Sequence, residues 1–189
     1  MGPPAFPRLI LTERLSIRPV EPAFAEAINA AVRESFAELR VWLPWADHVP
    51  EVAETRAHLT EQQRKFEAGS DCTLSLWLRT TGEFVGSSGL HPRPAETSRR
   101  EIGYWVRTSH TGRGLATEAV VAIAGTGFDA LGLTAIEIRA SERNLASQRV
   151  AERAGFRRDA LLDDGRLDPD GRPSRTVVYV RRRDDRAAG

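Results

Sequence analysis

The chain has 189 residues, of which 41% are hydrophobic and 28% are charged, and its formal net charge is +1. This length suits one domain with a buried core, and the balanced charge gives no general reason to expect nucleic acid as a partner. No apolar run approaches the roughly 20 residues of a membrane span, and the start MGPPAFPRL lacks the order of a signal peptide, so we expect a cytoplasmic protein without a membrane partner. Cys72 is the only cysteine, which excludes disulfide frameworks and multi-cysteine metal sites within one chain, and we expect no metal.

The first half of the chain predicts a strand, two helices and then three more strands. Residues 9–19 alternate apolar and polar side chains and end at a proline, as a strand does. From 22 to 39 apolar side chains recur at helical spacing. A second, more polar helix is expected at 51–68, with acidic residues early and basic residues late, as the helix dipole favours. The following strands are expected at 72–79, 83–91 and 99–107.

The second half alternates helices and strands. Its helices are expected at 115–131 and 144–155, and its strands at 135–141, 156–162 and 174–181. The order of elements is neither a regular βαβα alternation nor purely antiparallel, so one mixed sheet with helices on its faces fits best. We expect a single domain over 1–189, with a core of about 9–181 and frayed ends at 1–8 and 182–189.

The stretch HTGRGLATEA, residues 110–119, leads from a predicted strand into a predicted helix. The first turn of a helix has free amides and a partial positive charge, so anions bind there. Gly112 and Gly114 let the backbone approach phosphate oxygens without a Cβ in the way. Arg113 adds a cation and Thr117 a hydroxyl, and the pattern therefore indicates a phosphate-binding loop.

Other interpretations of this loop remain open at the level of the residues. A Walker-type loop is excluded, because it needs a lysine after its last glycine and Lys65 is the only lysine. A dinucleotide fingerprint would use Gly112 and Gly114 with Glu137 on the ribose, but Thr117 stands where its third small residue belongs, and three strands precede it. A glycine-rich turn without any ligand is the third interpretation.

The motifs that follow make one resemblance specific. TGRGLATEA resembles the acyl-CoA pyrophosphate loop of the GNAT superfamily of N-acetyltransferases, Q/R-x-x-G-x-G/A, with Thr111 in place of Q/R, Gly114 as the first required glycine and Ala116 as the final small residue. NLASQRVAERAGF resembles the second cofactor helix of the same superfamily. Four further segments resemble the RimJ/RimL-like branch, which acetylates ribosomal-protein N-termini: RLSIRP, LPWAD, FVGSSGLH and EIGYWV. The similarity spans residues 13–181.

This resemblance implies the fold and the activity. The fold would be an α+β αβα sandwich, in which a mixed, mostly antiparallel seven-stranded sheet carries helices on both faces and contains a splayed central strand pair. The activity would be acetyl-CoA-dependent N-acetyltransfer, by direct attack of a primary amine on the thioester. The acceptor would be a protein N-terminus or a small molecule such as a polyamine, amino acid or antibiotic. Exposed sheet edges are compatible with a homodimer.

A non-catalytic acyl-CoA-binding or regulatory module on the same fold is the alternative. Many superfamily members carry a tyrosine seven residues after the helix asparagine, as proton donor to the departing thiolate. Here that position is Ala151, so any proton donor must come from elsewhere.

The resemblance also implies which residues meet acetyl-CoA. The Val106 N–H would face the thioester oxygen. Arg149 and Arg153, with Arg107, Arg113 and Arg143, would meet the phosphates, or would simply form a solvated charged face. The cofactor-binding residues expected are Trp105, Val106, Arg107, Thr111, Gly112, Arg113, Gly114, Leu115, Ala116, Thr117, Asn144 and Ser147.

Two residues are the first candidates for proton transfer. Glu101 begins the strand that would line the cleft and is the candidate base, although it could equally be a solvated glutamate after two arginines. His91 and His110 are weaker candidates for the same role. Ser147 is the candidate acid, because a helix capped by Asn144 would place it at the N-terminal turn, where the dipole also stabilises a thiolate.

The acceptor site is expected at the loops 36–50 and 163–173. Trp42 and Trp45 would shape a slot for the acceptor, with His91 as a further contact, or would plug the core under the loop. Acidic residues of these loops could attract a cation or be merely solvated: Asp47, Asp163, Asp164, Asp168 and Asp170.

Overall fold

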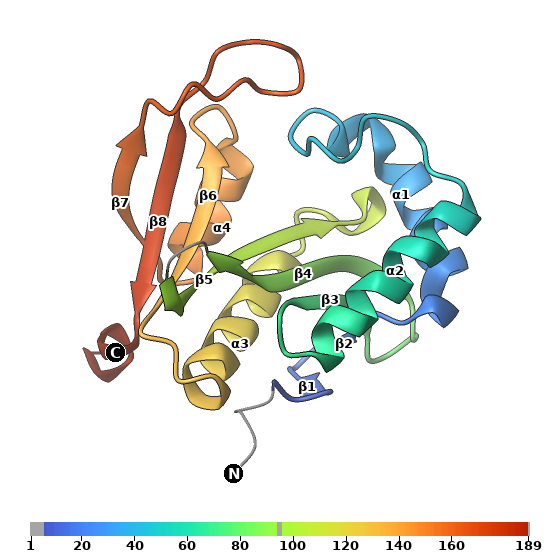
Figure 1. Cartoon of the computed structure of the whole chain (residues 1–189), viewed down its shortest axis with the longest axis horizontal. Coiled ribbons are helices and arrows are strands. Elements are labelled where there is room, and N and C mark those ends of the chain that lie inside the picture. The colour runs from blue at the N-terminus through green and yellow to red at the C-terminus, as the bar shows by residue number, and fades with distance from the viewer. Residues whose placement is uncertain (1–5, 94–95, 189) are drawn as a thin grey trace.

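An eight-stranded mixed sheet forms the centre of the protein (Figure 1). The computed structural model describes residues 6–93 and 96–188. Along the sheet the strands follow the order β1-β2-β3-β4-β5-β6-β8-β7, and all neighbours are antiparallel except β5 and β6. The strands are β1 (Ile10–Leu11), β2 (Leu15–Pro19), β3 (Cys72–Leu78), β4 (Phe84–Arg93), β5 (Glu96–Val106), β6 (Ala135–Ser141), β7 (Arg157–Leu162) and β8 (Thr176–Arg182).

The sheet has one strand more than expected, because the predicted strand 9–19 is a hairpin. Ile10 pairs with Ile17 across β1 and β2. Between these strands the Thr12 hydroxyl accepts a hydrogen bond of 2.9 Å from the Leu15 amide. A side chain that captures a nearby backbone amide in this way offers the chain a turn in place of a continuous strand.

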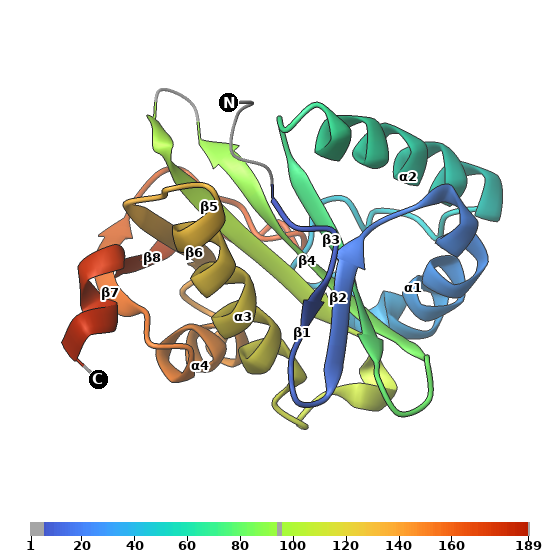
Figure 2. The same cartoon turned by 90° about the horizontal axis from the view of Figure 1, so that it is seen from below.

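Helices cover both faces of the sheet (Figure 2). α1 (Ala25–Leu39) and α2 (Val52–Glu67) lie on one face, and α3 (Leu115–Ala130) and α4 (Leu145–Arg153) lie on the other. The core under the first pair includes Ile28, Val32, Leu59, Trp77 and Phe84, and the core under the second includes Leu74, Leu76, Ile123, Phe128 and Ile136. The expected αβα sandwich is confirmed.

The two segments expected to fray differ from that expectation. Phe6 is buried in the core, because its ring packs with the apolar side chains on the α3 face of the sheet. Arg182 completes β8, and its amide donates a hydrogen bond of 2.8 Å to Asp185 at the start of a short 3-10 helix. The expectation is therefore wrong for these residues. The parts of the two segments at 1–5 and 189 lie outside the described residues.

One arginine, Arg107, ties α1 to the end of β5. Arg107 Nε donates a hydrogen bond of 2.6 Å to Glu34 Oε2, and its Nη1 donates one of 2.8 Å to Glu83 Oε1. The Ser109 amide donates to the second oxygen of Glu34 at 3.2 Å. Hydrogen bonds from Arg107 and then Ser109 lower the pKa of Glu34 from 4.5 to about 2.

Glu34→Gln should therefore reduce the dependence of the free energy of unfolding on pH in the acidic range. A carboxyl group whose pKa is lower in the folded state stabilises it above the unfolded pKa, and this contribution is lost as the pH falls from 4.5 toward about 2. Since the pair is partly exposed and screened, we expect a difference of about 1 kcal/mol at neutral pH that closes in this window. Urea unfolding at a series of pH values measures it. Glu26→Gln is the control. Glu26 lies on α1 like Glu34, and its exposed carboxylate is 3.7 Å from Arg56 of α2. An equal effect of this substitution would contradict the assignment.

Candidate active site

The two parallel strands at the centre of the sheet diverge. β5 and β6 are paired only between Arg99–Glu101 and Ala135–Glu137. Beyond Glu101 the strands separate, as Figure 1 shows, and a cleft of about 590 Å³ opens between their ends. The splayed central pair that the sequence led us to expect is confirmed. Because neither strand pairs with the other here, both present backbone N–H and C=O groups to whatever enters the cleft.

The glycine-rich loop borders this cleft at the start of α3. All seven residues of 111–117 line it, as do Trp105, Val106, Asn144 and Ser147. Gly112 and Gly114 have φ angles of +72° and +76°, a left-handed backbone that glycine adopts without strain. Among the described residues, the amides of 115–117 have no hydrogen-bond acceptor. The start of α3 is therefore an open anion site of the kind that the sequence indicated.

The turn between β1 and β2 holds the glycine-rich loop in place. Arg14 Nη1 donates a hydrogen bond of 2.8 Å to the Arg113 carbonyl, and Arg14 Nε donates one of 2.6 Å to Glu118 Oε2. Thr12 donates to the other oxygen of Glu118. Burial raises the pKa of Glu118, but the hydrogen bonds from Thr12 and Arg14 outweigh it and the pKa lies below its usual value. The sequence analysis missed this clamp, because its members are about a hundred residues apart.

Arginines line the cleft, although not all of those expected. Arg113, Arg149 and Arg153 line it and have no ion-pair partner in the part of the chain that the structure describes. Arg107 differs from the expectation: its guanidinium is bound by two carboxylates on the other side of β5, outside the lining. Arg143 is likewise bound away from the cleft, to two aspartates of the loop 163–173.

The aspartates of that loop are occupied by arginines. Asp164 contacts Arg139 at 3.4 Å, and Asp170 contacts Arg143 at 3.0 Å. Asp168 is only 2% exposed and accepts a hydrogen bond of 2.9 Å from the Ser141 hydroxyl. These carboxylates are therefore structural partners of arginine rather than a free cation site.

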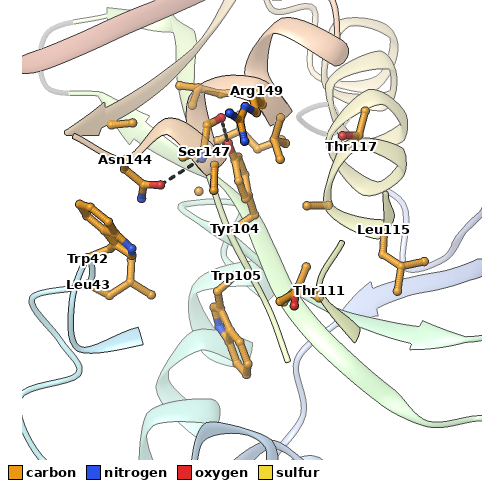
Figure 3. Close-up of a pocket in the computed structure, with 18 of the residues that line it drawn as sticks. Trp42, Leu43, Tyr104, Trp105, Thr111, Leu115, Thr117, Asn144, Ser147 and Arg149 are labelled. Atoms are coloured by element: carbon orange, nitrogen blue, oxygen red, sulfur yellow. Dashed lines mark hydrogen bonds between the residues drawn. The ribbon is translucent and has the colours of Figure 1, made fainter. Parts of the chain in front are cut away.

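A serine and a tyrosine meet above the cleft (Figure 3). The Asn144 side chain accepts a hydrogen bond of 3.0 Å from the Ser147 amide, so Asn144 caps α4 and Ser147 lies in its first turn, as the sequence predicts. The Tyr104 hydroxyl lies 2.9 Å from both the hydroxyl and the carbonyl oxygen of Ser147. Burial raises the pKa of Tyr104 to about 12, so this phenol is protonated at neutral pH.

Sequence analysis missed Tyr104. Its signal was the alternation in EIGYWV, which places Tyr104 on the face of β5 opposite to Trp105. Ile102 on the same face is buried under α3, and Tyr104 likewise points to the helices that carry the cofactor motifs. Ala151, where a tyrosine was sought, is fully buried in the core.

A second pocket lies on the other side of β5. It has a volume of about 570 Å³ and is bordered by α1, α2, β4 and β5. Leu43, Gly103, Tyr104 and Trp105 line both cavities, so the two meet along this part of the strand. Of the residues expected at the acceptor, Trp45 and His91 line this pocket, whereas Trp42 lines the cleft. His110 is buried, with its Nε2 3.4 Å from Glu83 Oε2.

Residues 14–157 match the sequence profile of the acetyltransferase (GNAT) domain. The chain belongs to the GNAT acetyltransferase family. YoaA of Bacillus subtilis (strain 168), named as an uncharacterized N-acetyltransferase, is 29% identical over 174 residues, which are 90% of this chain and 94% of YoaA.

Solved structures of similar shape include those of RimJ and RimL. RimJ of Mycobacterium smegmatis in complex with CoA-disulfide superposes with a TM-score of 0.84 at 24% identity, over 98% of this chain and 91% of RimJ. RimL, a ribosomal L7/L12 alpha-N-protein acetyltransferase in complex with coenzyme A, gives a TM-score of 0.84 at 20% identity, over 95% of this chain and 98% of RimL. These likenesses show the fold of this GNAT protein.

Carboxylates at the closed end of the GNAT cleft are held in ion pairs. Glu101 Oε2 lies 3.1 Å from Arg93 Nη1, and its role as the base stays a prediction. Glu137 is 7% exposed and lies 3.4 Å from Arg99 and 3.9 Å from Arg93. Because Glu137 is buried in this cluster, it is not placed to bind a ribose, which counts against the dinucleotide interpretation.

None of the helices within 6–93 and 96–188 combines the length and apolar character that crossing a bilayer requires. In the same residues, no group of three or more His, Cys, Asp or Glu side chains is arranged to hold a metal ion.

Proposed function

We propose that this GNAT protein is an acetyl-CoA-dependent N-acetyltransferase of RimJ/RimL-like type. The acceptor is a primary amine, either a protein N-terminal α-amine or a small-molecule amine, that attacks the thioester directly. The observation that carries the proposal is the splayed cleft, which joins an open helix N-terminus, three unpaired arginines and a protonated hydroxyl pair. Such an enzyme would meet its co-substrate in the cytoplasm.

The residues of the cleft fit acetyl-CoA. The amides of 112–117 would bind the pyrophosphate, because glycine backbone and a helix N-terminus together favour phosphate oxygens. Arg113, Arg149 and Arg153 would bind the remaining phosphate charge. The unpaired edges of β5 and β6 would bind the amide groups of the pantetheine arm, as a strand would. Acetyl-CoA itself supplies the activated acetyl group.

Ser147 would supply a hydrogen bond where negative charge develops on the leaving sulfur. Ser147 lies in the first turn of α4, where the helix dipole also favours an anion. Tyr104 acts through Ser147: its hydroxyl is bonded to both oxygens of that residue and fixes the serine side chain. Tyr104 is therefore a positioning residue, and its protonated state at neutral pH suits that role.

One experiment separates an enzyme from a non-catalytic acyl-CoA-binding module. The purified protein is incubated with acetyl-CoA and a panel of peptides and small amines, while release of free thiol is followed. We expect thiol release that depends on the amine, with the acetylated amine identified by mass spectrometry. Binding of acetyl-CoA without turnover on the whole panel would overturn the proposed enzyme and favour the module.

Removing two cleft arginines should weaken the binding of coenzyme A. The double variant Arg149→Ala, Arg153→Ala is expected to raise the Kd by about 10- to 100-fold, since each of these exposed arginines would contribute about 1 kcal/mol to binding a phosphate. The difference should shrink at high salt. Calorimetry measures it, and Arg157→Ala, Arg172→Ala removes the same charge outside the cleft as the control. Equal Kd values for both double variants would rule out the assignment.

Ser147→Ala should lower kcat more than it weakens acetyl-CoA binding. Loss of a hydrogen bond made mainly in the transition state is expected to lower kcat by about 10- to 100-fold. Tyr104→Phe should lower kcat less, and the double variant should be no slower than Ser147→Ala alone, because the two hydroxyls act as one unit. Single-turnover kinetics with calorimetric Kd values give both quantities. An unchanged kcat in Ser147→Ala under chemistry-limited conditions would remove Ser147 from the mechanism.

A further inference from the structure

The second pocket contains a histidine paired with an aspartate. His91 Nδ1 lies 2.8 Å from Asp71 Oδ1. The same aspartate oxygen accepts a hydrogen bond of 2.8 Å from the Cys72 amide, so Asp71 is fixed to the start of β3. His91 belongs to β4, and both side chains line the pocket. The pair thus joins two neighbouring strands at the point where the pocket meets the sheet.

The hydrogen bond determines which nitrogen of His91 is basic. Burial raises the pKa of Asp71, but the hydrogen bonds from His91 and the Cys72 amide outweigh it, and the pKa lies below its usual value. An ionised carboxylate can only accept a hydrogen bond, so Nδ1 of His91 must carry the proton. Nε2 of the neutral ring then keeps its lone pair, and within the described residues no group is hydrogen-bonded to it.

Two glycines direct the imidazole ring toward the cleft. A Cβ at Gly89 would lie 2.9 Å from Nε2 of His91 and 2.5 Å from the Cys72 carbonyl, so only glycine fits there. A Cβ at Gly103 would lie 3.7 Å from Nε2. The ring therefore lies over the paired residues Gly89 and Gly103, and Gly103 is one of the residues that line both cavities. The free nitrogen faces the strand that separates the acceptor side from the cleft.

The arginines are divided unequally between the two cavities, although each cavity also has two carboxylates in its lining. Five arginines line the cleft: Arg113, Arg139, Arg149, Arg153 and Arg166. The chain has 27 lysines and arginines, yet none of them is among the described residues that line the second pocket. That pocket contains two carboxylates, Asp71 and Glu54, and an apolar floor of Val20, Ile28, Val32 and Leu59. A pocket of this kind suits a cation that carries an apolar group rather than a phosphate.

We propose that the second pocket receives the acceptor as an ammonium ion and that Nε2 of His91, held by Asp71, removes its proton. The inference rests on the proposed acetyltransfer and adds to it the acceptor site and its base. The N–H bond of the ammonium breaks and its proton bonds to Nε2. The electron pair left on nitrogen forms the new bond to the acetyl carbon, the C–S bond of the thioester breaks, and coenzyme A leaves as the thiolate, which takes up the second proton that the nitrogen loses. The imidazolium is stabilised by the Asp71 carboxylate until it returns the proton to solvent.

The other titratable groups near the pocket are less suited than His91 to act as the base. Glu101 is its cross-strand partner, but its carboxylate is bound to Arg93. On α2, burial and then Lys65 lower the pKa of His58, and Glu54 accepts a hydrogen bond from the Glu51 amide at 2.7 Å. At the rim, the hydrogen bond to Asp47 raises the pKa of His48, which is exposed.

A pH profile tests the role of the histidine. His91→Asn keeps an N–H that can bond to Asp71 but has no basic nitrogen. With an amine that the wild type acetylates, kcat/KM should fall by about 100-fold or more near pH 7. The deficit should shrink as the pH passes the pKa of the amine itself, because the free base then needs no assistance. A deficit that is constant with pH, or no deficit, would overturn the proposal.

Asp71→Ala tests the pairing. The alanine side chain can neither accept a hydrogen bond from Nδ1 nor stabilise the imidazolium, so both contributions of the aspartate are removed. We expect a loss close to that of His91→Asn. His58→Gln, another pocket histidine, is the matched control: it is expected to change KM for the acceptor by a factor that does not vary with pH. A pH-dependent deficit in His58→Gln would contradict the assignment to His91.

A readout without turnover separates this inference from the proposed function. Two-bond 1H–15N NMR spectra of the free protein report which imidazole nitrogen carries the proton. We expect Nδ1–H for His91 in the wild type and a loss of this preference in Asp71→Ala, which has no acceptor for that proton. The Nε2–H form in the wild type would overturn the inference while leaving acetyltransfer intact. Absence of turnover with every amine would instead overturn the proposed function.

Discussion

The early end of pairing between β5 and β6 is the constraint on which the active site depends. Three residues of each strand are paired, and then the backbones separate. A parallel pair that stayed closed would satisfy its own backbone groups, and no extended ligand could lie between the strands. The pair separates because each strand is held elsewhere: β5 stays in register with β4 as far as Val106, and β6 stays paired with β8 as far as Ser141.

The cleft divides the molecule into two electrostatic environments. On the α3–α4 side and along the opening, arginines and the start of α3 favour phosphate oxygens. On the α1–α2 side, the pocket has carboxylates and imidazoles, and no lysine or arginine among the described residues that line it. The cleft therefore favours an anionic ligand, and the second pocket favours a cationic one. Residues 103–105 line both cavities, so the two ligands can meet there. The Glu34–Arg107 pair holds the arginine that follows β5 against α1, outside the lining of the cleft.

Local patterns in the sequence predicted much of this arrangement, and partnerships between distant residues did not follow from it. The glycine loop and the Asn144 cap were predictable because their geometry is determined within a few residues. The β1–β2 hairpin was missed because the Thr12 hydroxyl ends an otherwise continuous alternation. Arg107 was assigned to phosphate because a sequence does not show that Glu34, on another element, binds it. The Asp71–His91 pair was missed for the same reason, although His91 alone was a candidate.

The hydroxyl pair above the cleft joins a phenol from the sheet to the first turn of α4. Position 151 of α4 is fully buried against the core, so a phenol there would have to displace packed side chains. Tyr104 reaches the same helix from the sheet, and its hydroxyl contacts the first turn of α4 at Ser147. A phenol that comes from β5 moves with the strand that lines the cleft, so the position of the serine hydroxyl is coupled to the strand that would bind the thioester. The phenol of this site therefore comes from the sheet, and it contacts the first turn of α4 from outside that helix.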